Sequence, residues 1–231
     1  MTVERDGAGF ALVTLDRPDK RNALSLDLRA QLTGELSALA DDDAIRCVLL
    51  TGAGSAFCAG MDTSEFGGDR AHKERIVELS VGLFRTLGEF PKPVVAAING
   101  PAVAGGFALA LLCDVRIAST EARMGFLENR LGIPPSYAAA RAALPAALAT
   151  ELCLTGRLVD AEEAERLGIV SEVQAPDGLI PRAAAVAGEI AAAPPSASIE
   201  TKRRILIERQ TCWQPLFEAE ETALREALLG G

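Results

Sequence analysis

The sequence predicts an α/β domain, because short apolar runs typical of buried strands alternate with longer segments of helical periodicity. Residues 10–16, FALVTLD, are predicted as a strand, and residues 25–41 as a helix with Ser25 at its N-cap. Residues 45–52, IRCVLLTG, are predicted as a buried strand because most of them are apolar. The pattern becomes mostly helical from Tyr137 onward, so helices are expected to dominate the second half of the chain.

The middle of the chain continues this alternation. A helix is expected from about His72 to Glu89, and the prolines of PKPVVAAING mark the entry to another buried strand. Two adjacent glycines, Gly105 and Gly106, then precede an apolar helix. Short strands are predicted at VRIAS and ARMGF, which completes an alternating series compatible with one α/β core.

The C-terminal part is predicted to be helical, apart from one short strand, IVSEV. Asp160 stands where an N-cap would begin the helix AEEAERLG. The last two helices, 194–210 and 214–231, are expected to pack away from the core. We therefore divide the chain into a core, residues 1–190, and a helical segment, residues 191–231.

Composition excludes several classes of function. The net charge of −9 disfavours nucleic acid and anionic membranes as partners, although Arg17, Lys20 and Arg21 form a local cationic cluster. The N-terminus MTVERDGAGF lacks the pattern of a signal peptide, so a cytoplasmic location is expected. Five scattered cysteines with no CxxC pair favour reduced thiols over disulfides or zinc. The single histidine, His72, lies in a polar stretch, so neither a histidine-rich metal site nor a histidine-dependent triad is expected.

The glycine pair allows two interpretations. Small residues at a helix start can let the helix lie close to a neighbouring strand. Alternatively, the bare N–H groups at the helix N-terminus face a developing negative charge. A second glycine-rich turn, GAGSAFCAGMDTSEF, also follows a predicted strand and could bring the N–H of Met61 toward the same point as that of Gly105. Neither turn has the pattern of a nucleotide-binding loop.

Several motifs in fixed order carry a family resemblance. They are TLDRPDKRNALS, SAFCAGMDTSEF, KPVVAAINGPAVAGGFALALLCDVRIAS, MGFLENRLGIPP and LTGRLVDAEEAERLGIVSEV. From about Leu12 to Val173 the chain resembles the crotonase superfamily, the enoyl-CoA hydratase/isomerases. The resemblance implies a spiral of ββα units with a helical C-terminal segment, here shorter than usual, for assembly into a homotrimer or a dimer of trimers. It also implies an acyl-CoA thioester as substrate, with no cofactor besides the coenzyme A of that substrate and no metal.

The resemblance assigns the site residues. Two main-chain N–H groups hold the thioester oxygen in this family, and they correspond here to those of Met61 and Gly105. Hydratase-type members use two glutamates; the later one corresponds to Glu128, whereas Ala108 stands in place of the earlier one. A single glutamate is similar to the pattern of the Δ3,Δ2-enoyl-CoA isomerases, in which one carboxylate takes a proton from C2 and returns it to C4.

The isomerase interpretation predicts an apolar pocket around Glu128, with Ala108, Phe107 and Phe126 nearby, that raises the pKa of the carboxyl group. Two other functions remain open. One is a hydratase or decarboxylase in which Glu65, Asp69 or Tyr137 replaces the missing glutamate. The other is a non-catalytic acyl-CoA binder or assembly subunit.

The resemblance also places coenzyme A. The main-chain groups that line its path correspond here to those of Ala23, Leu24, Cys58, Ala59 and Gly60. The preceding basic residue, Arg21, corresponds to the position that approaches a phosphate. Tyr137 follows GIPPS, close to the expected acyl pocket, where we favour a packed ring over a catalytic hydroxyl.

Overall fold

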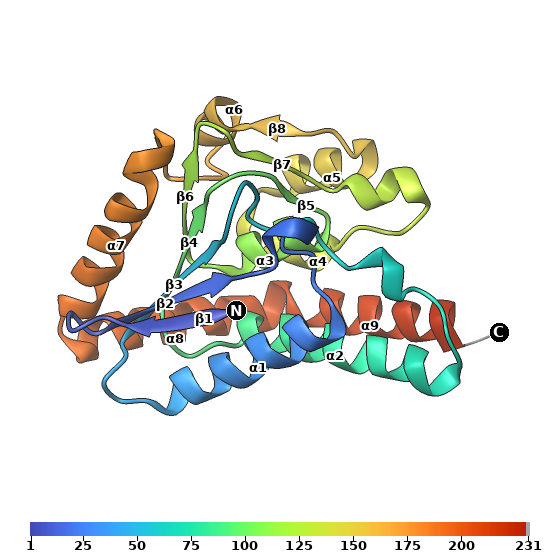
Figure 1. The fold of residues 1–231 in the computed structure, drawn as a ribbon, viewed down its shortest axis with the longest axis horizontal. Coiled ribbons are helices and arrows are strands. Elements are labelled where there is room, and N and C mark those ends of the chain that lie inside the picture. Colours follow the sequence, from blue (N-terminus) through green and yellow to red (C-terminus); the bar gives the residue numbers. More distant parts are fainter. Residues whose placement is uncertain (230–231) are drawn as a thin grey trace.

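A computed structural model describes residues 1–229 of the chain (Figure 1). Six strands form the large sheet: β1 (Thr2–Arg5), β2 (Phe10–Leu15), β3 (Cys47–Gly52), β4 (Val94–Ile98), β6 (Val115–Ser119) and β9 (Glu172–Gln174). Their order is β1-β2-β3-β4-β6-β9, and only β1 is antiparallel to its neighbour. A second sheet has the order β5-β7-β8, from β5 (Ala102–Val103), β7 (Arg123–Gly125) and β8 (Val159–Asp160).

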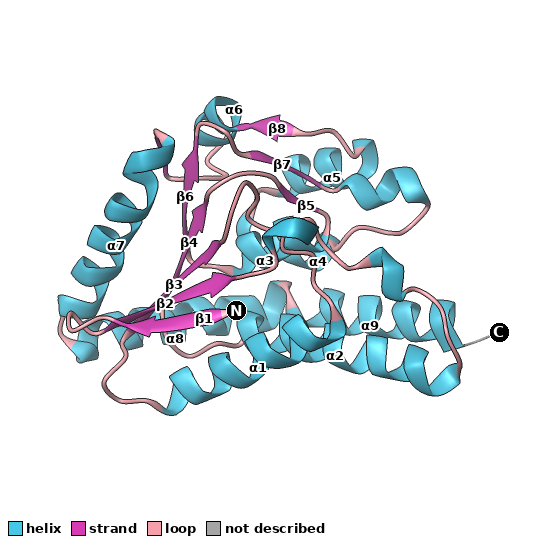
Figure 2. Ribbon diagram, viewed as in Figure 1, coloured by secondary structure: helices cyan, strands magenta, loops and turns pink. Residues whose placement is uncertain are grey.

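The helices cover both faces of the large sheet (Figure 2). They are α1 (Leu26–Asp41), α2 (Arg70–Gly88), α3 (Gly105–Leu112), α4 (Tyr137–Ala143), α5 (Ala146–Thr155), α6 (Ala161–Arg166), α7 (Pro176–Ala192), α8 (Pro195–Cys212) and α9 (Gln214–Leu229). Three short 3-10 helices span Pro18–Lys20, Thr63–Glu65 and Leu127–Leu131. Helix α7 buries Leu179 and a row of alanines against one face, while α1 and α3 contribute to the larger core on the other.

The chain repeats one path twice in its centre. A strand of the large sheet leads to a strand of the small sheet and then to a helix, first as β4-β5-α3 and then as β6-β7-α4. This repetition gives the spiral of ββα units expected from the resemblance, and the α/β class is confirmed. Because β5 and β7 are parallel neighbours, their carboxyl ends lie at the same edge and both open into the segments that carry site residues.

The predicted N-caps are confirmed. Ser25 Oγ accepts a hydrogen bond from the Leu28 N–H at 3.2 Å, and Asp160 caps α6 through the Glu163 N–H at 2.9 Å. Helix α2 begins slightly earlier than predicted, with Asp69 as its N-cap. The predicted strand IVSEV is shifted, because the buried Ile169 belongs to the turn after α6 and only the later residues join β9.

The expectation that the last two helices pack away from the core is wrong. Asp114, immediately before β6, accepts hydrogen bonds from Lys202 Nζ of α8 at 2.7 and 2.8 Å. Trp213 lies at the junction of α8 and α9 with 1% of its surface exposed, and its ring stacks on Phe217 at 4.7 Å. Helix α9 packs along α2, so the C-terminal helices are part of the same packed unit.

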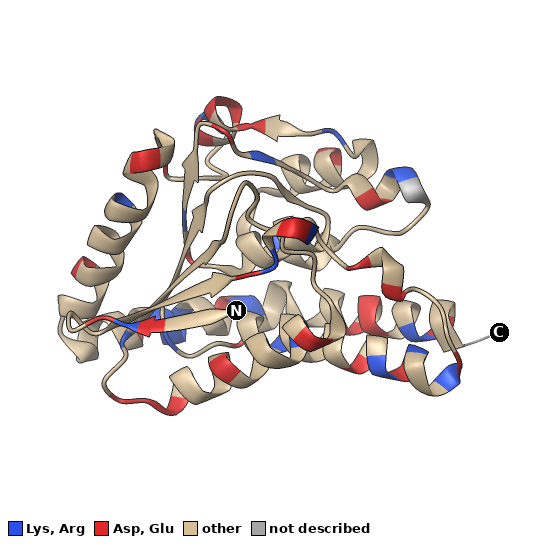
Figure 3. Cartoon of the chain, in the orientation of Figure 1, with Lys and Arg blue, Asp and Glu red and all other residues tan. Residues whose placement is uncertain are grey.

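Charged residues lie mainly on the helices and loops (Figure 3). Strands β3 and β4 at the centre of the large sheet contain no charged residue, in keeping with burial on both faces. Among the described residues, none of the helices combines the length and apolarity needed to cross a membrane.

Candidate active site

Four backbone segments from separate parts of the chain run side by side. Leu24 pairs in parallel with Met61, and Cys58 pairs in parallel with Ala102 at the start of β5. Strand β5 in turn pairs with β7, which leads directly to Glu128. The structure therefore brings together, along one array, most of the positions that the sequence assigned to oxyanion binding, coenzyme A binding and proton transfer.

The loop after β3 approaches the start of α3 very closely. A β-carbon on Gly60 would lie 2.9 Å from Ala104 Cβ and 3.1 Å from the Gly105 nitrogen. One on Gly106 would lie 2.1 Å from the Cys58 carbonyl oxygen, so Gly106 is required for packing. The structural interpretation of the glycine pair therefore holds for Gly106.

Gly105 is different from its neighbour. A β-carbon there would lie 3.6 Å or more from every surrounding atom, including Met61 Cγ at 3.8 Å, so packing does not require glycine. Within residues 1–229, no main-chain carbonyl accepts a hydrogen bond from the N–H of Gly105 or of Met61. Two adjacent turns thus present free donors, and the positive end of α3 adds to the potential at Gly105.

Backbone strain occurs at the residue before this pair of donors. Ala104, the N-cap of α3, has φ 52° and ψ −129°, a conformation that normally requires glycine. Its N–H donates to the Gly125 carbonyl of β7 at 2.9 Å, which fixes the turn between β5 and α3. The strain sets the direction in which Gly105 presents its N–H, and nothing in the local sequence indicated it.

Buried polar side chains hold the loops of the expected coenzyme A path. Asn22 is fully buried and donates to the carbonyls of Ala53 and Ala56 at 2.9 and 2.7 Å. Arg17 forms an ion pair with Asp62 at 3.0 Å and donates to the Ala23 carbonyl. Asp62 is therefore an anchor for the loop after Met61 rather than a free base. The pairing partners of Asn22 are distant in sequence, so local patterns did not identify it.

The exposed segment before α1 retains a free cation. Arg21 adopts a left-handed conformation with φ 49°, and its carbonyl accepts from the Ala59 N–H at 3.0 Å. Its guanidinium makes no hydrogen bond or ion pair with the described part of the chain. The Leu24 N–H donates to the Gly60 carbonyl at 2.8 Å, so the two segments assigned to the coenzyme are joined directly.

Glu128 has the electrostatics of a proton-transfer group. Burial raises the pKa of its carboxyl from 4.5 to about 7. Its Oε2 atom is buried and has no hydrogen-bond partner among the described residues. Phe107 of α3 and Phe126 pack with ring centroids 4.9 Å apart, and Ala108 is 1% exposed. The predicted rise in pKa is confirmed, and its cause is desolvation.

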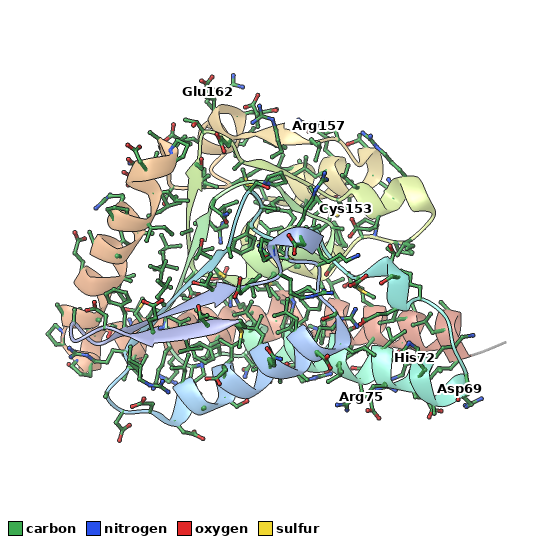
Figure 4. The ribbon with its side chains drawn as sticks, in the orientation of Figure 1. Asp69, His72, Arg75, Cys153, Arg157 and Glu162 are labelled. Atoms are coloured by element: carbon green, nitrogen blue, oxygen red, sulfur yellow. The ribbon has the colours of Figure 1, made fainter. Side chains whose placement is uncertain are left out.

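The candidate replacement acids already have structural roles. Glu65 accepts a hydrogen bond from the Leu26 N–H at 2.8 Å, and Asp69 accepts one from the His72 N–H at 2.9 Å. Figure 4 shows Asp69 and His72 together near the start of α2. The Tyr137 hydroxyl lies 3.4 Å from Thr150 Oγ1. All three therefore contribute to helix starts or helix packing.

A half-buried carboxyl from the last helix also reaches this region. Glu220 of α9 accepts hydrogen bonds from Ser136 Oγ at 2.8 Å and the Ala138 N–H at 2.7 Å. Burial raises the pKa of the Glu220 carboxyl. Burial also raises the pKa of the Cys153 thiol to about 12, and the negative charges of Glu220 and Glu128 add to that rise. Cys153, labelled in Figure 4, is a buried residue. Glu220 therefore fixes the start of α4. Only the folded structure identifies this role, because the residues in contact are far apart in the sequence.

The fold and these parts define a class of protein: an α/β domain with two free main-chain donors and a desolvated carboxyl on neighbouring strand ends. The family model for enoyl-CoA hydratase/isomerase matches residues 5–224. The chain belongs to the enoyl-CoA hydratase/isomerase family.

Individual relatives agree with this assignment. A Thermus thermophilus protein named provisionally as an enoyl-CoA hydratase is 38% identical over 212 residues, covering 88% of this chain and 83% of the relative. The (E)-benzylidenesuccinyl-CoA hydratase of Thauera aromatica is 37% identical, covering 85% and 78%. The crystal structure of an enoyl-CoA hydratase/isomerase from Pseudoalteromonas atlantica superposes with a TM-score of 0.86 at 30% identity, covering 100% and 91%.

Proposed function

We propose that the chain is an enoyl-CoA isomerase that converts a 3-enoyl thioester to the 2-enoyl thioester. The observation that carries this proposal is the desolvated Glu128 carboxyl, with its unpartnered Oε2, in a site where Ala108 occupies the place of a second glutamate. One carboxyl suffices for isomerisation because the proton removed from C2 is the proton delivered to C4.

The proposed reaction has two steps. The Glu128 carboxylate takes a proton from C2, and the electron pair of the broken C–H bond moves toward the thioester oxygen to give a dienolate. The N–H groups of Met61 and Gly105 stabilise that oxygen, each by about 3 kcal/mol. The Glu128 carboxylic acid then protonates C4, which restores the carboxylate and leaves the double bond between C2 and C3.

The coenzyme A part of the substrate is proposed to follow Ala23, Leu24 and the loop of Cys58, Ala59 and Gly60. Ala23 and Ala59 are the half-buried residues of this path, and the free guanidinium of Arg21 could reach a phosphate without breaking an existing ion pair. Assembly into a trimer or a dimer of trimers remains a prediction from the family resemblance.

Hydration is the second candidate function, because the names of several relatives specify hydratases. Addition of water needs one group to activate the water and another to protonate the product. The structural roles of Glu65, Asp69 and Tyr137 weigh against any of them as that second group. A binding role without catalysis is less well supported, since a desolvated carboxyl with no partner has no structural benefit.

The test is to offer the purified protein trans-3-hexenoyl-CoA and crotonyl-CoA separately and identify the products by mass and ultraviolet absorbance. The isomerase proposal expects a 2-enoyl product from the first substrate and no water addition to the second. Hydration of crotonyl-CoA would favour the second candidate, and no reaction with either would contradict catalysis on simple enoyl chains.

A variant pair tests the oxyanion site. Gly105→Pro removes the N–H at the first position of α3, where proline is tolerated in helices. Turnover is expected to fall about 10²–10³-fold. Gly105→Ala retains the N–H and fits the available space, so it is the matched control. Full turnover by a folded Gly105→Pro variant would remove Gly105 from the proposed mechanism.

A further inference from the structure

Arg29 is a buried cation of α1 that the proposed reaction does not use. Only 1% of its surface is exposed, and it forms no ion pair with the described part of the chain. The two carboxylates that influence its charge are bonded elsewhere. Glu65 accepts a hydrogen bond from the Leu26 N–H, and Asp62 pairs with another arginine. A buried charge without an ion pair lowers stability, and such groups are typical of functional sites.

The guanidinium of Arg29 is fixed at two points. Its Nε donates to the Leu24 carbonyl at 2.8 Å, and its Nη1 donates to Ser80 Oγ of α2 at 3.1 Å. Helices α1 and α2 lie side by side (Figure 1), so the Ser80 contact joins two helices. The Leu24 contact instead reaches the segment that pairs with Met61. One end of this side chain is therefore connected to the candidate oxyanion site.

Leu24 sets the orientation of the Met61 donor. Its N–H donates to the Gly60 carbonyl at 2.8 Å, and its own carbonyl accepts from the Asp62 N–H at 3.3 Å. The Gly60–Met61 peptide is trans, so its carbonyl and its N–H point in opposite directions. Because the Gly60 carbonyl faces Leu24, the Met61 N–H points away from Leu24. Arg29 makes the shorter of the two hydrogen bonds that hold the Leu24 carbonyl.

We propose that Arg29 is a positioning residue for the oxyanion site, because its Nε holds Leu24 and Leu24 directs the Met61 N–H. This inference rests on the oxyanion site of the proposed function and adds a residue that does not itself contact the substrate. A misplacement of about 1 Å at a reacting centre can cost about 10²-fold in rate, so the anchor of a donor affects catalysis. The donor at Nε carries this role, and the charge of the guanidinium does not.

Two substitutions separate the donor from the rest of the side chain. Arg29→Gln places an amide nitrogen where Nε lies and removes the charge and the Ser80 contact, whereas Arg29→Met has no donor there. With trans-3-hexenoyl-CoA, kcat of Arg29→Met should fall about 10–100-fold with little change in KM, because the donor acts mainly on the dienolate. Arg29→Gln should keep kcat near that of wild type. Ser80→Ala, which removes only the other anchor, should do the same.

A binding measurement tests the same role without turnover. Butyryl-CoA labelled with carbon-13 at the thioester carbonyl has no double bond to move or hydrate, and its infrared carbonyl stretch reports hydrogen bonds to the oxygen. The stretch should move to lower wavenumber on binding to wild type and Arg29→Gln, and move less on binding to Arg29→Met. If Arg29→Met does not fold, Arg29→Lys, which has a carbon where Nε lies, takes its place with the same expected result.

Three results would overturn the proposal. They are an unmoved carbonyl stretch in wild type, a folded Arg29→Met or Arg29→Lys variant that matches wild type, and an Arg29→Gln variant as impaired as Arg29→Met. A wild-type protein that moves the stretch of butyryl-CoA but does not isomerise trans-3-hexenoyl-CoA contradicts only the proposed function. In that case the infrared comparison still decides the role of Arg29.

Discussion

Replacing Glu128 with glutamine should increase stability while removing activity. The carboxyl is buried, its Oε2 has no partner, and its pKa is raised from 4.5 to about 7. The folded chain therefore holds this proton more tightly than the unfolded chain does. Stability contributed by the protonated group is present at low pH and is lost as the pH rises from about 4.5 to about 7.

The size of the effect follows from the shift. Each pKa unit corresponds to about 1.4 kcal/mol, so the rise from 4.5 to about 7 gives an upper value of about 3 kcal/mol above neutral pH. Glutamine has nearly the same shape and no charge to desolvate. Glu128→Gln should therefore be more stable than wild type by up to about 3 kcal/mol near pH 8 and by less than about 1 kcal/mol near pH 5.

Urea unfolding at both pH values measures this difference, with Glu121→Gln as the control at an exposed carboxylate. Isomerase turnover of Glu128→Gln should fall about 10²–10⁴-fold, and wild-type kcat/KM should rise through about pH 7 as the base ionises. The reasoning is refuted if Glu128→Gln is no more stable than wild type near pH 8, or if it retains wild-type turnover.

Three further substitutions test the backbone and the core. Gly106→Ala should lower the free energy of unfolding in urea by about 1–3 kcal/mol, since its β-carbon would lie 2.1 Å from a carbonyl oxygen. Gly105→Ala should leave the free energy of unfolding unchanged, and equal losses of stability in the two variants would contradict this packing. Ala104→Gly should raise the free energy of unfolding by about 1 kcal/mol, because glycine relieves the backbone strain. A urea midpoint below that of wild type would argue against that strain. Lys202→Met should lower the thermal midpoint and cost about 3–5 kcal/mol, because it removes the close cationic partner of Asp114 and leaves that buried carboxylate with the Val94 N–H and the more distant Arg209 guanidinium. An unchanged thermal midpoint would show that the Lys202–Asp114 pair adds nothing to stability.

The alternation of the longer strands and helices was predictable because it depends on local periodicity and capping, whereas the strands β1 and β8 were not predicted. Ser25 and Asp160 cap their helices as predicted, and the buried strands correspond to uniformly apolar runs. The short strand β5 was not predicted, because its two residues, Ala102–Val103, are too few to give a periodic signal. Its pairing depends on contacts between distant segments.

The site was predictable where its parts are motifs and unpredictable where they depend on tertiary contacts. The family resemblance singled out Glu128 as the candidate base, and the rise in its pKa was expected from the apolar residues around it. The strained conformation of Ala104 has no sequence signature, since alanine ordinarily adopts helical or extended backbone and its presence predicts no positive φ. Glu220 reaches its partners from α9, 82 residues beyond Ala138, so only the folded structure identifies its role.

The paired segments at the site have a consequence for how a ligand would act on the whole chain. Leu24, Met61, Ala102 and Gly125 contribute neighbouring backbone from four separate turns of the spiral. An unfolded chain or an isolated fragment cannot bring these peptide groups together, so a ligand held by them would bind only the native state. Its binding energy would therefore add directly to global stability, and amide exchange would slow in segments far from the ligand.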